Sequence, residues 1–98
     1  MVTQTIVEEY KERMHISHNE DDNLKRMLSS SVAYVKSKCG DFDVLGESDI
    51  DVRANELVIE RTRYLYNDAV EFFEDNFLSD ITSLGLDIAM EGEIVDEV

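Results

Sequence analysis

The chain has 98 residues, 43% of them hydrophobic, and nine Lys or Arg against 23 Asp or Glu give it a formal net charge of −14. A chain of this length forms one domain, and its charge excludes generic wrapping of nucleic acid, which requires a basic surface. The lone Cys39 excludes an internal disulfide framework, and neither a membrane-length apolar run nor a signal-peptide pattern occurs, so we expect synthesis in a reducing cytoplasm.

Two helices are predicted in the first half, because proline is absent and apolar residues recur every three to four positions. The first helix is predicted to start at Thr5, whose spacing to Glu8 matches a T-x-x-E capping box. A second capping box, Ser17 with Glu20, is predicted to start a helix that runs to about Cys39. The buried seam of this second helix is predicted to consist of Leu24, Leu28, Ser31 and Val35.

The second half is predicted to contain a loop, a long helix and a weaker helix. Gly40 is placed to end the second helix, and the acidic loop 41–51 follows it. A third helix is predicted over 51–74, and a fourth over 77–88, where the residues also alternate as in a strand. The expected fold class is therefore all-α: a small bundle of three to four helices with an acidic interhelical loop. We expect one helical domain over residues 1–90 and a flexible acidic tail over residues 91–98.

Charge and aromatic residues are unevenly distributed along the chain. Arg63 is the last cation, and residues 64–98 contain ten Asp or Glu and no Lys or Arg. Five of the eight aromatic residues lie at the start of that segment: Tyr64, Tyr66, Phe72, Phe73 and Phe77. An anionic segment rich in large apolar side chains needs a surface on which to pack, which predicts assembly rather than chemistry.

The loop after the second helix matches part of a twelve-residue calcium-binding loop. Positions 1, 3, 6 and 9 of such a loop are occupied by Asp41, Asp43, Gly46 and Asp49. Leu45 at position 5 and Val52 at position 12 lack the oxygen ligands required there. We therefore favour a solvated interhelical loop and expect no metal or cofactor, and calorimetry with millimolar calcium tests this.

Candidate catalytic residues are not predicted. His15 and His18 form an H-x-x-H pair, but no neighbouring Cys or His completes a set of four metal ligands. Cys39 lies on the apolar seam of the second helix, where a small buried residue is the ordinary interpretation. The carboxylates are too numerous to single out an acid–base pair, so we expect no enzymatic activity.

Arg61 and Arg63 are the last cations before the anionic segment. One interpretation is local pairing with acids such as Glu60, which contributes only a few tenths of a kcal/mol. The other interpretation is pairing with an acidic neighbour in an oligomer, where a partly buried pair specifies register. The spacing alone favours neither.

The segment ERTRYLYNDAVEFFEDNFLSDITSLGLDIA, preceded by NLKRMLSSSVAYVKSKCG, resembles the phage head–tail connector (head-completion adaptor) proteins. The similarity covers residues 5–90 and is most specific in the R-x-R-Y-x-Y-N-D core. It implies a helical subunit of the virion that assembles as a ring of about twelve copies under the portal protein. Such a ring extends the DNA channel without specific DNA binding and provides a docking surface for the next connector or tail protein.

The resemblance also implies subunit and portal contacts near its most specific segment. We assign them to Arg61, Arg63, Tyr64, Tyr66, Phe73 and Phe77. The acidic loop is our candidate for the channel-facing surface, where carboxylates would repel DNA phosphates. Its residues are Asp41, Asp43, Glu47 and Asp49. The expected location is the head–tail interface of the virion, after assembly in the host cytoplasm and without membrane contact.

The alternative hypothesis is an acidic DNA mimic that inhibits a DNA-binding protein. A mimic would present carboxylates at phosphate-like spacing and would bind a basic cleft with strong salt sensitivity. The concentration of aromatic residues favours the connector, because a mimic needs displayed charge more than apolar surface.

Overall fold

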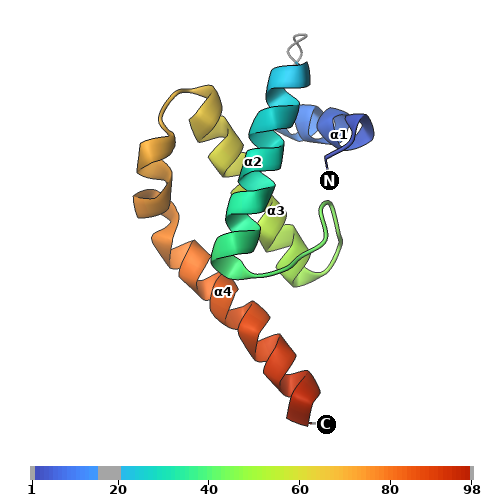
Figure 1. The fold of residues 1–98 in the computed structure, drawn as a ribbon, viewed down its shortest axis with the longest axis vertical. Coiled ribbons are helices and arrows are strands. Elements are labelled where there is room, and N and C mark those ends of the chain that lie inside the picture. The colour runs from blue at the N-terminus through green and yellow to red at the C-terminus, as the bar shows by residue number, and fades with distance from the viewer. Residues whose placement is uncertain (1, 16–20, 98) are drawn as a thin grey trace.

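The computed structural model describes residues 2–15 and 21–97, with side chains described as far as Glu91. Within these residues the elements are α1 (Gln4–Met14), α2 (Asp21–Cys39), α3 (Asp49–Tyr66), the short 3-10 helix η1 (Val70–Phe72) and α4 (Phe73–Glu97). Helix α2 packs against both α3 and α4, and α1 lies against α2 and α3 (Figure 1). The extents of 49 × 29 × 18 Å reflect α4, which extends beyond the other helices. The predicted all-α bundle is confirmed.

The core is formed by apolar side chains from all four α-helices and the loop before α3. The predicted seam of α2 is confirmed, because its four residues are all buried: Leu24, Leu28, Ser31 and Val35. Opposite them lie Ala54, Leu57 and Val58 of α3. Phe73, Ile81 and Leu84 of α4 complete this part of the core. In α2 these positions recur every three to four residues, and the spacings in α3 and α4 also fit one helical face, so each of these helices buries one face.

The N-cap residue of helix α1 lies two residues before the predicted one. Thr3 is the N-cap residue, and its Oγ1 accepts a hydrogen bond from the Ile6 backbone N–H at 3.4 Å. The predicted capping box at Thr5 and Glu8 is therefore wrong, because Thr5 lies inside the helix and Thr3 already satisfies its first turn. The helix ends at Met14, and His15, which has the left-handed conformation, is its C-cap residue. The second predicted box, Ser17 with Glu20, lies outside the described residues, as does His18.

The third and fourth helices are divided at a different place from the prediction. Helix α3 ends at Tyr66, whereas the sequence pattern predicted a helix as far as Glu74. Asn67 caps it, donating from both its backbone N–H (3.0 Å) and its side-chain Nδ2 (2.9 Å) to the Arg63 carbonyl. Asp68 then adopts φ 58°, a left-handed conformation that stops the helix. The reversal returns Phe73 to the core, a tertiary effect that overrides the helical pattern.

Helix α4 is longer than the predicted fourth helix. It begins at Phe73, bends at Phe77 (φ −117°, ψ 16°) and continues through Glu97. The alternating strand pattern of its apolar residues is therefore not realised. Residues 91–97, which we assigned to a separate acidic tail, continue the helix.

A buried asparagine joins α1, the acidic loop and α3. Asn55 Oδ1 accepts hydrogen bonds from the Tyr10 hydroxyl at 2.5 Å and the Leu45 backbone N–H at 3.0 Å. Its Nδ2 donates to the carbonyl oxygens of Asp43 (3.1 Å) and Asp51 (2.6 Å). Because Asn55 is only 1% exposed, its side-chain amide is shielded from water, and its hydrogen bonds fix the loop onto α3.

The buried Tyr10 predicts a loss of stability at alkaline pH. Burial raises the pKa of its hydroxyl well above the ordinary value of 10.0. The folded chain therefore holds this proton where the unfolded chain has lost it, so the free energy of unfolding falls as pH rises above about 10. We expect urea unfolding followed by circular dichroism to show a shallower fall for Tyr10→Phe than for the wild type. Equal slopes would contradict the assignment to Tyr10. Tyr34, whose pKa is raised to about 12 by burial and by Glu74, accounts for part of the remaining fall.

Candidate interaction site

Arg61 lies half-buried between α3 and α2 without a carboxylate partner among the described residues. Its Nη1 donates to Ser30 Oγ at 3.1 Å and to Ser31 Oγ at 3.3 Å. The guanidinium carbon lies 4.4 Å from the centre of the Tyr34 ring, a cation–π contact. Burial lowers the pKa of Arg61, which reflects the cost of removing its charge from water. A half-buried arginine without an acid is unusual in a chain of charge −14 and marks this surface as a binding candidate.

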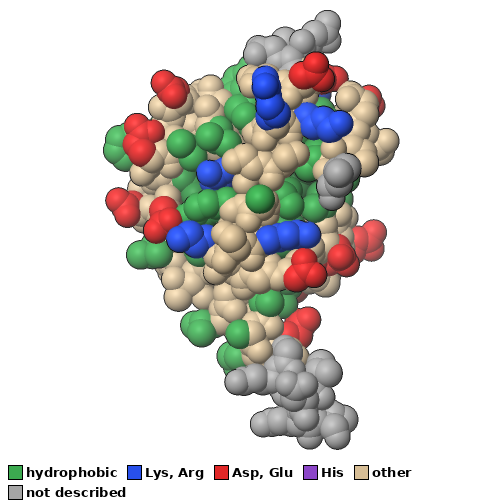
Figure 2. Space-filling view, viewed as in Figure 1, with side chains coloured by type: hydrophobic (Ala, Val, Ile, Leu, Met, Phe, Trp, Pro, Cys, Tyr) green, Lys and Arg blue, Asp and Glu red, His purple; other side chains and the backbone are tan. Residues whose placement is uncertain are grey.

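The outer surface of α2 is the basic region of this acidic protein. Residues 23–40 contain four Lys or Arg and no Asp or Glu. In Figure 2, Lys and Arg side chains gather over α2, whereas Asp and Glu lie toward the edges of that face. Lys25 and Arg26 are exposed and, among the described residues, form no ion pair. This surface, with Arg61 beside it, suits a partner that carries carboxylates.

Arg63 lies in a different environment from Arg61. It pairs with Glu60 at 2.9 Å, so the local-pairing interpretation holds for Arg63 and fails for Arg61. Arg63 lines a pocket of about 450 Å³ between α1, α3 and α4, together with Arg13 and Arg53. Each of these two arginines also has an acid of its own: Arg13 pairs with Glu9 (3.7 Å) and Arg53 with Asp87 (2.6 Å). The pocket is therefore charge-balanced and offers less to an anionic partner than the α2 surface.

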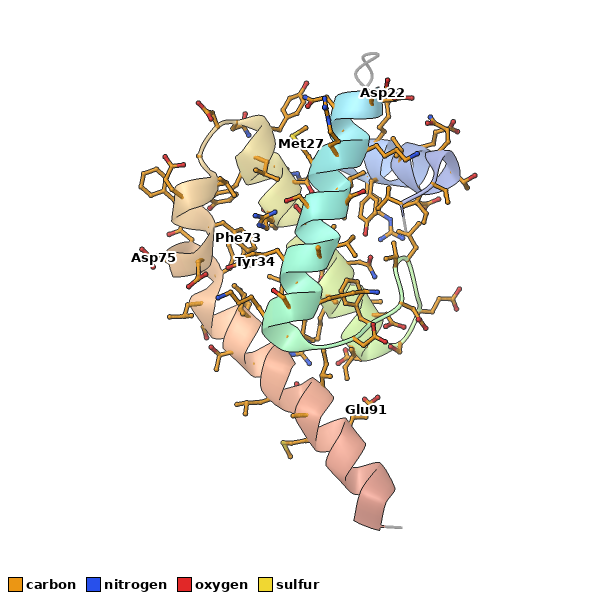
Figure 3. All side chains as sticks on the ribbon, in the orientation of Figure 1. Asp22, Met27, Tyr34, Phe73, Asp75 and Glu91 are labelled. Atoms are coloured by element: carbon orange, nitrogen blue, oxygen red, sulfur yellow. The ribbon has the colours of Figure 1, made fainter. Side chains whose placement is uncertain are left out.

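Most of the aromatic residues that we predicted to need a partner pack on one another inside the chain. Phe73 is buried, stacks on Phe77 at 4.9 Å and meets the rings of Tyr34 and Tyr64 edge to face at 5.9 and 5.7 Å. Figure 3 shows Tyr34 of α2 and Phe73 of α4 next to each other between the two helices. Phe73 is therefore a core residue, and its assignment to an intersubunit surface is corrected. Tyr64 and Phe77 are half-buried in the same cluster, and of the aromatic residues predicted as contacts only Tyr66 is exposed.

Three exposed apolar residues lie on α4, and the sequence analysis assigned none of them to a contact. Leu78, Leu86 and Met90 are 53%, 60% and 54% exposed. They recur at intervals of eight and four residues, so they lie on one outer face of the helix, and exposed Phe72 precedes them. The sequence signal for this face is the four-residue spacing of Leu86 and Met90, which differs in phase from the buried positions Ile81 and Leu84.

Hydrogen bonds and ion pairs hold the acidic loop against its neighbours. Asp51 Oδ1 accepts from the Asp43 backbone N–H at 2.9 Å, and this bond is the main cause of the lowered pKa of Asp51. Asp41 pairs with Lys36 at 3.4 Å and Asp49 with Arg53 at 3.5 Å, while Glu47 is exposed. No group of three His, Cys, Asp or Glu able to hold a metal occurs within the described residues. A channel-facing role for the loop stays a prediction.

Cys39 is buried at the end of α2, and its Sγ lies 3.4 Å from the Ile81 carbonyl oxygen. Burial raises the pKa of this thiol, which disfavours the reactive thiolate.

Within the described residues, no helix combines the length and apolar character needed to cross a membrane. No protein-family model, curated protein or solved structure matches the chain.

Proposed function

We propose that this chain is a structural, non-enzymatic subunit of a phage head–tail connector, which assembles as a ring under the portal protein. The sequence resemblance suggests this role, and the outer face of α4 is the observation that carries it. Leu78, Leu86 and Met90 remain more than half exposed on a helix that extends beyond the bundle. Exposed apolar side chains in a row favour a protein contact.

The distribution of charge supports a ring rather than an isolated subunit. The chain carries a basic surface on α2 and a strongly acidic helix, α4, whose residues 73–97 include eight Asp or Glu and no base. Two different and complementary surfaces on one subunit favour head-to-tail contacts, which close into rings when the rotation permits. The net charge of −14 also suits a channel wall that DNA passes without adhering.

The DNA-mimic alternative fits these surfaces less well. A mimic displays carboxylates to a basic cleft, but the surface over α2 displays Lys and Arg instead. The exposed apolar face of α4 has no use in such a mimic. Salt-sensitive binding to a DNA-binding enzyme, together with failure to bind portal, would favour the mimic.

Electron microscopy of the chain mixed with the portal protein from the same genome tests the proposal. We expect rings seated on the portal, and the chain free in solution under these conditions would overturn the proposal.

Arg61 is expected to matter more for this assembly than Arg63. In Arg61→Glu a carboxylate would replace the half-buried guanidinium, so we expect ring formation to weaken at least about 30-fold, or ~2 kcal/mol. Arg63→Glu, the matched control, disturbs only a local pair with Glu60 and should change assembly less than threefold. Sedimentation velocity measures both, and circular dichroism verifies that each variant is folded. Equal effects of the two substitutions would contradict the assignment of Arg61 to a contact.

A further inference from the structure

Two carboxylates of the pocket between α1, α3 and α4 lack an ion-pair partner within the described residues. The pocket has a volume of about 450 Å³, and these two acids of its lining are Glu56 of α3 and Asp80 of α4, both exposed. The arginines of the lining are bound by other acids, of which Glu9 and Asp87 lie outside the lining. Glu56 and Asp80 therefore remain to bind a cation that enters the pocket.

The uncharged part of the pocket lining is apolar. Leu57, Ile59 and Leu84 are buried, and Phe77 is half-buried. An occupant therefore needs an apolar stem to cover these side chains and a cationic end to reach the carboxylates. Lysine and arginine combine both features, because their aliphatic stems commonly lie along apolar surface. An acidic side chain would be repelled, and a neutral one would leave both carboxylates unpaired.

The chain supplies such a side chain from α2. Six of the nine Lys and Arg pair with a carboxylate within the described residues, and the exceptions are Lys25, Arg26 and Arg61. Arg26 lies two positions from the buried Leu24 and Leu28. Two positions turn a helix by about 200°, so Arg26 projects away from the core. Its exposed neighbours on this outer side are small and allow a second copy to approach closely: Ser29, Ser30 and Ala33.

The pocket and the outer side of α2 lie on different sides of α3. In Figure 1, α2 crosses in front of α3, and the Thr62 hydroxyl of α3 donates to Ser31 Oγ of α2 at 3.0 Å. Glu60, which lines the pocket, is two positions from Thr62 and so points away from α2. Within the described part of the chain, α2 contributes no residue to the pocket lining. Arg26 therefore cannot enter the pocket of its own copy.

We infer that Arg26 of one copy enters the pocket between α1, α3 and α4 of a second copy and pairs there with Glu56 and Asp80. This inference rests on the proposed ring and specifies the contact between neighbours in it. The pocket and the outer side of α2 are different surfaces, so a pair of copies leaves one of each free. Such a contact adds further copies head to tail until the ring closes.

This contact agrees with the different effects expected for Arg61 and Arg63. Arg61 binds Ser30, which lies one helical turn from Arg26, so Arg61 belongs to the docking surface of α2. Arg63 lines the pocket, but a cation does not bind the incoming Arg26. Replacing Arg63 leaves both carboxylates that bind Arg26 in place.

Carbodiimide crosslinking of the full chain locates the contact. The reagent joins a lysine amine to a carboxylate that touches it, so we would use an Arg26→Lys chain, which keeps the charge. An equal mixture of ¹⁵N-labelled and unlabelled chains distinguishes products between copies in mass spectrometry. We expect an amide from the new lysine to Glu56 or Asp80 of another copy, whereas the native Lys36 should join neither. Attachment of the new lysine only to other carboxylates, or a chain that stays monomeric up to about 1 mM, would overturn the inference.

Charge reversal at Arg26 tests the side chain that enters the pocket. Arg26→Glu should self-associate at least about tenfold more weakly than the wild type in sedimentation velocity, because it places an acid against two acids. Lys36→Glu makes the same change of charge ten residues later on α2 and should weaken association less than about threefold. Both positions are exposed, and circular dichroism verifies that both variants are folded. Equal effects of the two substitutions would contradict a contact at Arg26.

Charge reversal in the pocket tests the receiving surface. Glu56→Lys combined with Asp80→Lys should also weaken self-association at least about tenfold. The matched control combines Glu47→Lys with Asp75→Lys, which changes an exposed Glu and an exposed Asp outside this pocket. The control should not weaken association, and equal losses in the two double variants would overturn the inference.

Combining the reversals gives the sharpest outcome. A chain that carries Arg26→Glu together with Glu56→Lys and Asp80→Lys again has opposite charges on the two surfaces. Its self-association should return to within about threefold of the wild type, which separate structural effects of the substitutions would not produce. A triple variant that associates no better than the Arg26→Glu chain would overturn the inference.

Failure of this inference is distinguishable from failure of the proposed function. If the crosslink forms as expected but no ring binds the portal, the neighbour contact stands and the connector function fails. If rings form on the portal and Arg26→Glu does not weaken them, the connector function stands and the proposed contact fails. Crosslinks from Glu56 or Asp80 to the portal protein, and none to a second copy, would also overturn the proposed contact.

Discussion

Gly40→Ala is expected to destabilise the fold by about 3 kcal/mol, a loss of about 12 °C or more in melting temperature. Gly40 ends α2 with φ +126°, a conformation that residues with a side chain rarely adopt. Its N–H donates to the Lys36 carbonyl at 3.1 Å, so the backbone is held in place. An added Cβ would also lie 2.7 Å from Cγ2 of Ile88 on α4, so the Ile88 side chain or the helices would have to shift.

Gly85→Ala is the matched control for this substitution. Gly85 lies inside α4, and an added Cβ would meet the Cys39 Cα and the Lys38 carbonyl oxygen at 3.6 Å, an ordinary contact. Alanine should therefore stabilise the helix by up to about 1 kcal/mol. Urea unfolding followed by circular dichroism measures both variants. A Gly40→Ala chain as stable as the wild type would show that neither the left-handed turn nor the contact with Ile88 constrains the fold.

Asn55→Leu is expected to destabilise the fold by about 4 kcal/mol, although leucine has the same branched shape. The substitution leaves the Tyr10 hydroxyl, the Leu45 N–H and the carbonyl oxygens of Asp43 and Asp51 without their partner. Desolvated polar groups without hydrogen bonds cost about 1–3 kcal/mol each, and rearrangement of the loop recovers part of this. The loss is a large share of the stability of a domain of this size, about 5–10 kcal/mol.

Two further variants show whether the loss comes from the network. Asn76→Leu removes a hydrogen bond to the Tyr64 hydroxyl (3.0 Å) at an exposed site and should cost less than about 1 kcal/mol. Tyr10→Phe removes one of the four partners of Asn55 and should cost about 1 kcal/mol at neutral pH. The free energy of unfolding in urea measures all three. An Asn55→Leu chain within 1 kcal/mol of the wild type would contradict the role given to this network.

The features that local spacing determines were predicted from the sequence. The seam of α2 and its end at Gly40 follow from helical periodicity and from the conformational freedom of glycine, and both are confirmed. The all-α class follows from the absence of proline and the recurrence of apolar residues.

The features that depend on tertiary contacts were not predicted from the sequence. The break at Asn67 and Asp68 lies inside an uninterrupted helical pattern, and it arises because Phe73 packs back on Tyr34 and Tyr64. Asn55 lay on the predicted third helix without any sign that it would bind the loop. Local spacing likewise could not separate Arg61 from Arg63, because only the fold shows which of them has an acid within reach.

The extension of α4 has a consequence for how two copies approach each other. The projecting end of α4, residues 87–97, carries five acids and no base at one end of a molecule 49 Å long, whereas residues 23–40 carry four bases and no acid (Figure 1). This asymmetry is an electric dipole moment, and it rotates an approaching copy so that regions of opposite charge face each other. At an ionic strength of about 0.1 M the field decays over about 10 Å, a fraction of the molecular length, so alignment begins only near contact. In dilute buffer the same torque acts from much farther away.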